Sequence, residues 1–90
     1  MVKKQKLYQR LINSQKNVKF SDFVTVIIAF GFSFNRITGS HHIYDHTDVP
    51  QSVSIQPDNN QAKPYQIRQF LRLVEKYNLK LNDNDEETEQ

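Results

Sequence analysis

Three histidines lie within six positions of the sequence, at His41, His42 and His46. In an extended chain, residues four apart are separated by roughly 13 Å at ~3.3 Å per residue, so His42 and His46 cannot share one metal ion locally. His41 and His42, as neighbours, point to opposite faces of a strand. The chain has no cysteine, and it lacks the HExxH spacing of zinc proteases. We therefore expect no metal site and no cofactor.

A histidine without a metal can still cleave RNA, because the 2′-hydroxyl of the substrate is itself the nucleophile and needs only a base. Imidazole, with an ordinary pKa near 6.5, suits that proton transfer at neutral pH. A nearby cation can then stabilise the charge that builds up on phosphorus. The alternative for each histidine is a hydrogen-bonding surface residue with no part in catalysis. Gly39-Ser40, directly before His41, is short enough to close a hairpin.

Two helices are expected before this turn. Residues 3–12 form a short amphipathic pattern around Leu7 and Leu11. A second helix is predicted to begin at Ser21 as its cap and to end before Gly31, where a left-handed residue belongs. Residues 24–28 are all β-branched, which favours a strand by propensity alone. Periodicity and capping favour the helix.

A small antiparallel sheet and a last helix are expected after it. Alternating polar and apolar residues predict strands near 33–38, 41–46 and 52–56, with a second turn over 48–51 that takes Pro50 out of the sheet. Pro64 suits the first turn of a helix that continues to about Tyr77. The predicted fold is α+β, a three-stranded antiparallel sheet with helices on one face and an extra N-terminal helix.

The charge is distributed unevenly along the chain. All twelve lysines and arginines lie at or before Lys80, whereas five of the ten acids lie in 83–89, so the first 82 residues carry a net charge of +7. A body this basic attracts polyanions, and the acidic segment 83–90 is typical of a disordered tail. No apolar run approaches the roughly 20 residues of a membrane span, and no signal peptide is evident. We expect a cytoplasmic protein with no membrane partner.

Three stretches together resemble the HicA family, the toxins of HicA-HicB toxin-antitoxin pairs. They are Gly31-Phe32, then Arg36-Ile37-Thr38-Gly39-Ser40-His41-His42-Ile43-Tyr44, then Ala62-Lys63-Pro64-Tyr65-Gln66-Ile67-Arg68-Gln69-Phe70-Leu71. The resemblance spans roughly residues 20–81. The Gly-Ser-His turn is its sharpest motif. The resemblance divides the chain into an N-terminal helical extension over 1–19, a HicA-like domain over 20–82 and the acidic tail over 83–90.

The resemblance implies a fold like that of double-stranded-RNA-binding domains and metal-independent cleavage of mRNA, inhibited by a HicB antitoxin. The family's catalytic histidine follows Gly-Ser and corresponds to His41, with His42 as the alternative, because strand alternation places His42 with Tyr44 and His46. Residues that could contact RNA are Arg36, Gly39, Ser40, Tyr44, Lys63 and Arg68. For Tyr44 the alternative is a half-buried strand residue, and for the cations a solvated charge. Competing functions are a non-catalytic RNA-binding module and a protein-interaction module of the same fold.

Overall fold

The structure is a computed structural model that describes residues 3–82. The segment 83–90, expected to be a disordered tail, lies outside the described residues. The helices are α1 (Lys3–Asn13), α2 (Phe20–Ala29) and α3 (Pro64–Lys76), and the strands are β1 (Ser33–Thr38), β2 (His41–His46) and β3 (Val49–Ile55). The element order α-α-β-β-β-α confirms the predicted α+β fold.

The β-branched run over 24–28 is helical and lies within α2. Phe23, Val26 and Ile27 of this helix have no exposed surface, so burial of an apolar stripe outweighs the strand propensity of single residues. Gly31 follows the helix with a φ of +98°, as predicted for the residue after its end. The predicted cap was wrong: the extended residue before α2 is Lys19, and Ser21 lies within the first turn. Its carbonyl accepts a hydrogen bond from Thr25 Oγ1 at 2.9 Å.

The other two helices follow their predicted patterns. In α1, Leu7 and Leu11 are buried, and the ring of Tyr8 meets Phe30, directly after α2, edge to face at 4.9 Å. In α3, Pro64 lies at the start, where a missing N–H costs nothing. Ile67 and Phe70 are almost fully buried on the inner stripe.

The three strands form one antiparallel sheet in the order β1-β2-β3. The pairing of β1 with β2 shifts register between Phe34 and Arg36, which leaves Asn35 as the extra residue of a bulge. The third strand begins at Val49, three residues earlier than predicted, and so includes Pro50. Pro50 was wrongly assigned to a loop. Because β3 is an edge strand, a residue without an N–H is tolerated there.

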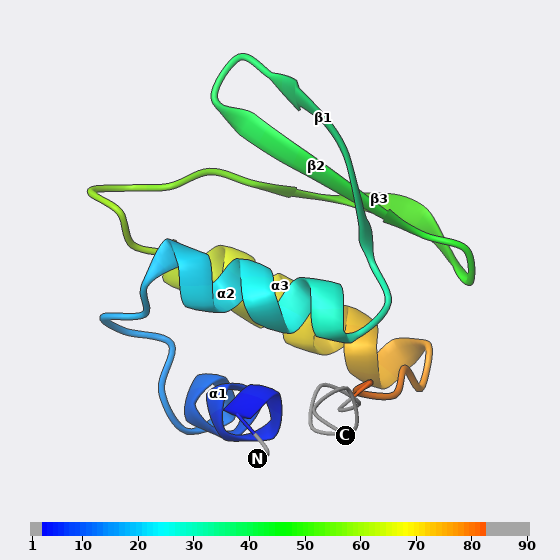
Figure 1. Ribbon diagram of the computed structural model, residues 1–90, viewed down its shortest axis with the longest axis horizontal. Coiled ribbons are helices and arrows are strands. Elements are labelled where there is room, and N and C mark those ends of the chain that lie inside the picture. The colour runs from blue at the N-terminus through cyan, green and yellow to red at the C-terminus, as the bar shows by residue number, and fades with distance from the viewer. Residues whose placement is uncertain (1–2, 83–90) are drawn as a thin grey trace, which may run out of the picture.

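The molecule has three layers (Figure 1): the sheet, then α2 with α3, then α1 on the far side of the helices. Side chains of β3 that face the helices, Val49, Val53 and Ile55, are buried. Four phenylalanines hold the centre together, since the ring of Phe70 meets those of Phe23, Phe30 and Phe32, each at 5.7 Å. No helix of residues 3–82 lies over the opposite face of the sheet.

Candidate active site

The turn between β1 and β2 consists of Gly39 and Ser40 alone. Thr38 and His41 pair across it as the last residues of the ladder. Gly39 has a φ of +62°, in the left-handed region that two-residue hairpins require and that glycine adopts without strain. Gly39, Ser40 and His41 are all exposed. The imidazole of His41 therefore stands at the mouth of a tight hairpin, within reach of a ligand in solvent.

His41 and His42 have different surroundings. His42 pairs with Ile55 of β3, whose side chain is buried under the helices, so His42 faces the helix layer. Its ring packs edge to face on Phe20 at a centroid distance of 5.2 Å, and its side chain is half-buried. His41 projects from the opposite, uncovered face because side chains alternate along a strand. Of the two, His41 is the more accessible.

Arg36 lies on the same uncovered face as His41. It pairs with Ile43, two residues along β2 from His41, and it is exposed. Residues in this diagonal relation are roughly 7–8 Å apart, within reach of a side chain as long as arginine. The guanidinium can thus approach a phosphate held beside His41.

A bridge of side chains joins the turn to the start of α3. Gln56, which follows β3, donates a hydrogen bond from Nε2 to Ser40 Oγ at 2.8 Å. The same side chain accepts one at Oε1 from Lys63 Nζ at 3.3 Å. Its backbone N–H donates to Oε1 of the buried Gln66 at 3.0 Å. We call this set, Ser40, Gln56, Lys63 and Gln66, the Gln56 bridge.

The Gln56 bridge has a chemical consequence at the turn. Because Ser40 Oγ accepts from Gln56, the proton of its hydroxyl is free to be donated elsewhere. The bridge also holds the Lys63 ammonium near the turn. Sequence reasoning missed Gln56, since a glutamine at the polar end of a strand carries no signal of its own.

Two helices begin at the end of the molecule where the Gln56 bridge lies (Figure 1). The Phe20 N–H donates to the Asn60 carbonyl at 2.9 Å, and the Ala62 N–H donates to the Val18 carbonyl at 2.8 Å, which ties the two starts together. Lys19 and Lys63 precede α2 and α3, and neither makes a side-chain cap. Uncapped N–H groups and the positive ends of both helix dipoles therefore add to the lysine charges. Asp22, in the first turn of α2, is the acid nearest in sequence to Lys19.

Three residues that the sequence offered as candidates, Tyr44, His46 and Arg68, do not contact the turn. Tyr44 is only 5% exposed and meets Phe34 edge to face at 5.6 Å, so its ring has no open face for a base and the prediction that it stacks on RNA is not supported. Burial also raises the pKa of the Tyr44 hydroxyl. His46 packs on Phe32 at 5.0 Å, and its Nδ1 accepts a hydrogen bond from the Asp48 N–H. Arg68 is exposed on α3 and takes no part in the Gln56 bridge.

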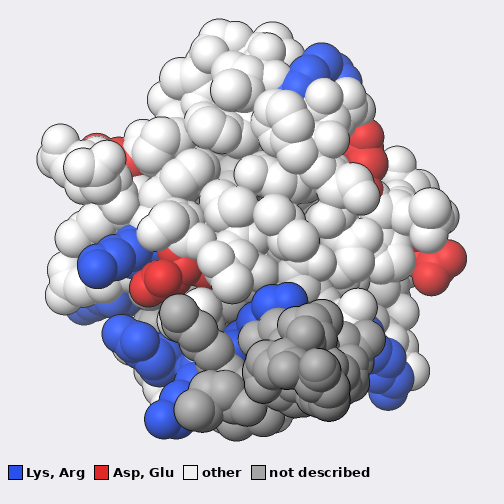
Figure 2. Space-filling view, in the orientation of Figure 1, with Lys and Arg blue, Asp and Glu red and all other residues white. Residues whose placement is uncertain are grey.

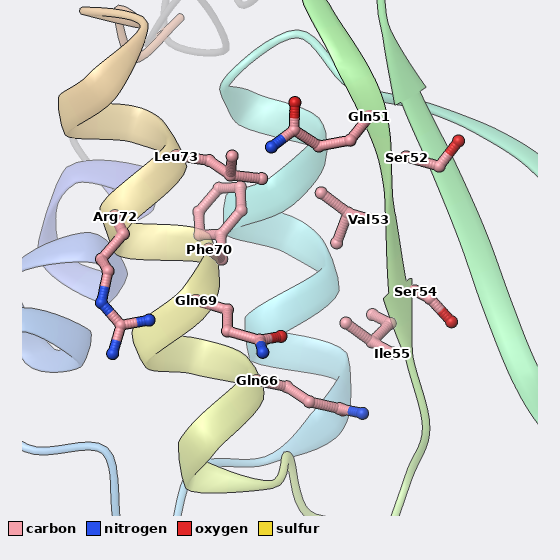
Figure 3. A pocket seen from close by; sticks show the side chains of 10 residues that line it. All are labelled: Gln51, Ser52, Val53, Ser54, Ile55, Gln66, Gln69, Phe70, Arg72 and Leu73. Carbon is pink, nitrogen blue, oxygen red and sulfur yellow. The ribbon is translucent and has the colours of Figure 1, made fainter.

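A separate groove of about 330 Å³ lies between β3 and α3 (Figure 3). Gln66 and Gln69 point from the helix toward the strand, whereas the guanidinium of Arg72 points away from it. Of the residues that the structure describes, no histidine or carboxylate lines this groove. Within residues 3–82, no group of three or more histidine, cysteine or acidic side chains could hold a metal ion.

The fold and the site together define a small α+β domain that presents a histidine after a Gly-Ser turn, next to a basic end of the molecule. The family model for the HicA toxin of bacterial toxin-antitoxin systems matches residues 20–75. The match covers more than half of the 90-residue chain, and the protein belongs to the HicA toxin family. Membership of this family implies an antitoxin as its partner. No curated protein and no solved structure matches the chain.

The matched region begins at the first residue of α2 and ends one residue before the end of α3. It therefore contains the sheet, both inner helices and the Gln56 bridge. The helix α1 and the loop that follows it lie outside the match. Among the described residues, none of the helices is long and apolar enough to cross a membrane.

Proposed function

We propose that this HicA-family toxin is a metal-independent endoribonuclease that acts on mRNA, with His41 as the general base. The observation that carries the proposal is the placement of His41: exposed, directly after the Gly39-Ser40 turn, on the uncovered face of the sheet. His42, the alternative, contacts Phe20 in the helix layer and is less accessible.

In this mechanism the neutral imidazole of His41 removes the proton of a ribose 2′-hydroxyl. The resulting oxygen attacks the adjacent phosphorus, the bond to the 5′-oxygen breaks, and that oxygen takes up a proton. The products are a 2′,3′-cyclic phosphate and a free 5′-hydroxyl. DNA, which lacks the 2′-hydroxyl, is not cleaved by this route. Imidazole suits the proton transfer because its ordinary pKa lies near neutral pH.

Groups around the turn support the charge that develops on the phosphate. Arg36 can approach from the same face of the sheet, and Lys63 is held near Ser40 by Gln56. The free hydroxyl proton of Ser40 can be donated to a phosphate oxygen. Preorganised donors of this kind typically contribute more to phosphoryl chemistry than one mobile charge, because they need no reorganisation during the reaction.

The antitoxin partner is proposed to be of the HicB type and to inhibit by covering the Gly39-Ser40-His41 turn. The turn is exposed at the end of the β1-β2 hairpin, so a bound protein can shield it without disturbing the core. In a cleavage assay, a stoichiometric amount of this antitoxin should suppress product formation. Unchanged cleavage by the fully formed complex would contradict inhibition at the turn.

The proposed activity is tested by incubating the full-length protein with 5′-labelled mRNA in excess EDTA. Fragments ending in 2′,3′-cyclic phosphate are expected, and a DNA strand of the same sequence should remain intact. RNA that is retained but never cut, even at high protein concentration, would favour a non-catalytic RNA-binding module. Absence of both retention and cleavage would favour a protein-interaction module.

A further inference from the structure

A cleft of about 420 Å³ lies between α1, the loop that joins it to α2, and the start of α2. Most of its lining precedes residue 20, where the family match begins, so it belongs to the N-terminal extension. Of the residues that the structure describes, three cations, Arg10, Lys16 and Lys19, and one acid, Asp22, line the cleft. All three cations are exposed. The cleft is therefore basic and open to solvent.

The remaining polar lining suits a sugar-phosphate chain. Asn13 and Asn17 carry amide N–H groups, and Asn17 has a φ of +58°, which bends the loop around the cleft. Amide donors between cations are typical of contacts to phosphate and sugar oxygens. Figure 2 shows lysine and arginine side chains gathered over the region of α1, its following loop and the start of α2, whereas the region of the sheet is mostly uncharged in this view.

The cleft lies beside the start of α2, which is tied to the segment that leads to the Gln56 bridge. Lys19 lines the cleft and directly precedes Phe20, whose ring packs on His42. Lys19 also pairs with Gln61, two residues before Lys63 of the Gln56 bridge. Lys19 of the cleft and Lys63 of the Gln56 bridge thus precede two helix starts that are tied together by backbone hydrogen bonds.

We propose that this cleft, formed mainly by the N-terminal extension, binds the phosphate backbone of the same RNA strand whose cleavage site lies at the turn. The inference rests on the proposed function and extends it, by giving the extension a role in holding substrate. RNA is favoured over an acidic protein because three cations and one acid of the described residues line the cleft, and because Lys19 of the cleft pairs with Gln61 in the segment that leads to Lys63 of the Gln56 bridge. The RNA strand then makes phosphate contacts at two places on the protein, the cleft and the turn.

The test measures the salt dependence of RNA binding by the full-length chain. The probe is a 2′-O-methyl RNA oligomer of about 16 nucleotides, which cannot be cleaved because its 2′-oxygen carries no proton. The double variant Arg10→Gln/Lys16→Gln removes two cations of the cleft. The matched control, Lys76→Gln/Lys80→Gln, removes two exposed cations near the C-terminal end of α3. Lys76 lies about 18 Å along the helix from Pro64, at ~1.5 Å per residue.

Each phosphate contact to a single strand contributes about 0.7 to the slope of log K against log salt concentration. The cleft variant should lose roughly 1.4 from that slope and bind on the order of ten times more weakly near 0.1 M salt. The control should keep the parent slope. An oligomer of about six nucleotides, in the range of a single binding site, should show a smaller difference because it cannot occupy both places.

A cleft variant with the slope and affinity of the parent overturns the proposal, whether or not the parent cleaves RNA. An equal loss in the control overturns it as well, since that result reports overall charge. If the cleft variant binds RNA as the parent does but loses affinity for the antitoxin, the cleft is a protein interface and the proposal fails. The cleavage assay on unmodified RNA tests the proposed function separately.

Discussion

His41 and His42 illustrate how adjacent residues of one type receive different roles. The alternation of a strand predicts that they face opposite sides, and the sequence shows no more than that. Which side is covered depends on where α2 lies, and only the structure places Phe20 against His42. The turn motif was predictable, since Gly39-Ser40 is a hairpin signal in the sequence. His41 is exposed beside the turn, whereas Ile43 on the same face is buried, so the accessibility of His41 depends on its place at the end of the strand.

The two glycines of the chain should differ in their tolerance of a side chain. Gly39→Ala places a Cβ in open space, so its cost is the left-handed backbone alone, about 1 kcal/mol. Gly31→Ala adds a Cβ 3.0 Å from His46 Nε2 at a φ of +98°, so it should cost about 2 kcal/mol or more. Urea unfolding of both variants measures the difference. Equal losses would contradict the close approach of His46 to Gly31.

Tyr44 and His46 show where residue-level prediction stops. An aromatic residue on a strand next to a basic turn suggested stacking on RNA, but the same alternation that exposes His41 buries Tyr44. His46 takes a structural part in the second turn, where its Nδ1 accepts the Asp48 N–H. The rings that cover Tyr44 and His46, Phe34 and Phe32, lie in or before another strand, so these contacts depend on how the sheet and helices pack.

At the scale of elements, a carboxylate ties all three strands together on the uncovered face. Asp45 of β2 accepts hydrogen bonds from Ser52 of β3 and from Asn35 of β1, the bulged residue. These two hydrogen bonds, with a smaller contribution from the charge of Arg36, hold the pKa of Asp45 below its usual value. The bulge was not predicted from the sequence. It directs the side chain of Asn35 toward the carboxylate of Asp45.

The lowered pKa of Asp45 predicts a particular dependence of stability on pH. A carboxyl group whose pKa is lower in the folded chain stabilises it at pH values above the unfolded pKa, here 3.8. That contribution is lost as the pH falls through the lowered, folded pKa. Asp45→Asn should therefore be less stable than the parent at neutral pH, and the difference should shrink on acidification. Unfolding curves at a series of pH values test this, and a difference that grows toward low pH would contradict the sign.

The Gln56 bridge makes a prediction about positioning. Gln56→Ala removes the acceptor for Lys63 and the donor to Ser40, so the turn and the lysine are no longer held together. The loss of about 1 kcal/mol of hydrogen bonding should lower kcat/KM roughly five-fold. Gln69→Ala, an exposed glutamine on α3 outside the bridge, is the matched control and should behave as the parent.

A structural role alone would lower the stability of the Gln56 variant without changing its kinetics below the unfolding transition. The discriminating measurement is therefore made well below that transition, with kcat and KM determined separately. Adding Lys63→Ala to Gln56→Ala should produce less further loss than Lys63→Ala causes in the parent, because the two residues act together. Fully additive losses would contradict the bridge.

At the scale of the whole molecule, the fold was predictable because the apolar periodicities agree with one another along the chain. The stripes of α1, α2 and α3 and the alternation of the strands all point to one core. Boundaries were less predictable: Lys19 replaces Ser21 as the residue before α2, and β3 begins at Val49. The first shift accompanies a long-range pairing of Lys19 with Gln61, and the second a local turn in which Val49 pairs with His46.

The free energy of unfolding should depend strongly on the ring of Phe70. Phe70 is 1% exposed and contacts three other phenylalanines from α2 and the loop that follows it. Phe70→Ala should cost about 3–5 kcal/mol, a large share of the stability of a domain this small. Chemical unfolding measures the loss. Tyr65→Ala, which removes an exposed ring on the same helix, should cost less than 1 kcal/mol, and a similar cost in both variants would contradict the placement of the core.

The central claim, that His41 is the general base, is tested most directly by comparing His41→Ala with His42→Ala in the EDTA cleavage assay. The parent, both variants and their RNA retention are measured under the same conditions. His41→Ala should reduce cleavage at least 100-fold while keeping its fold and its affinity for RNA. His42→Ala should lose stability through its contact with Phe20 but retain cleavage below its unfolding transition. Full activity in His41→Ala, or loss of activity in His42→Ala alone, would contradict the assignment.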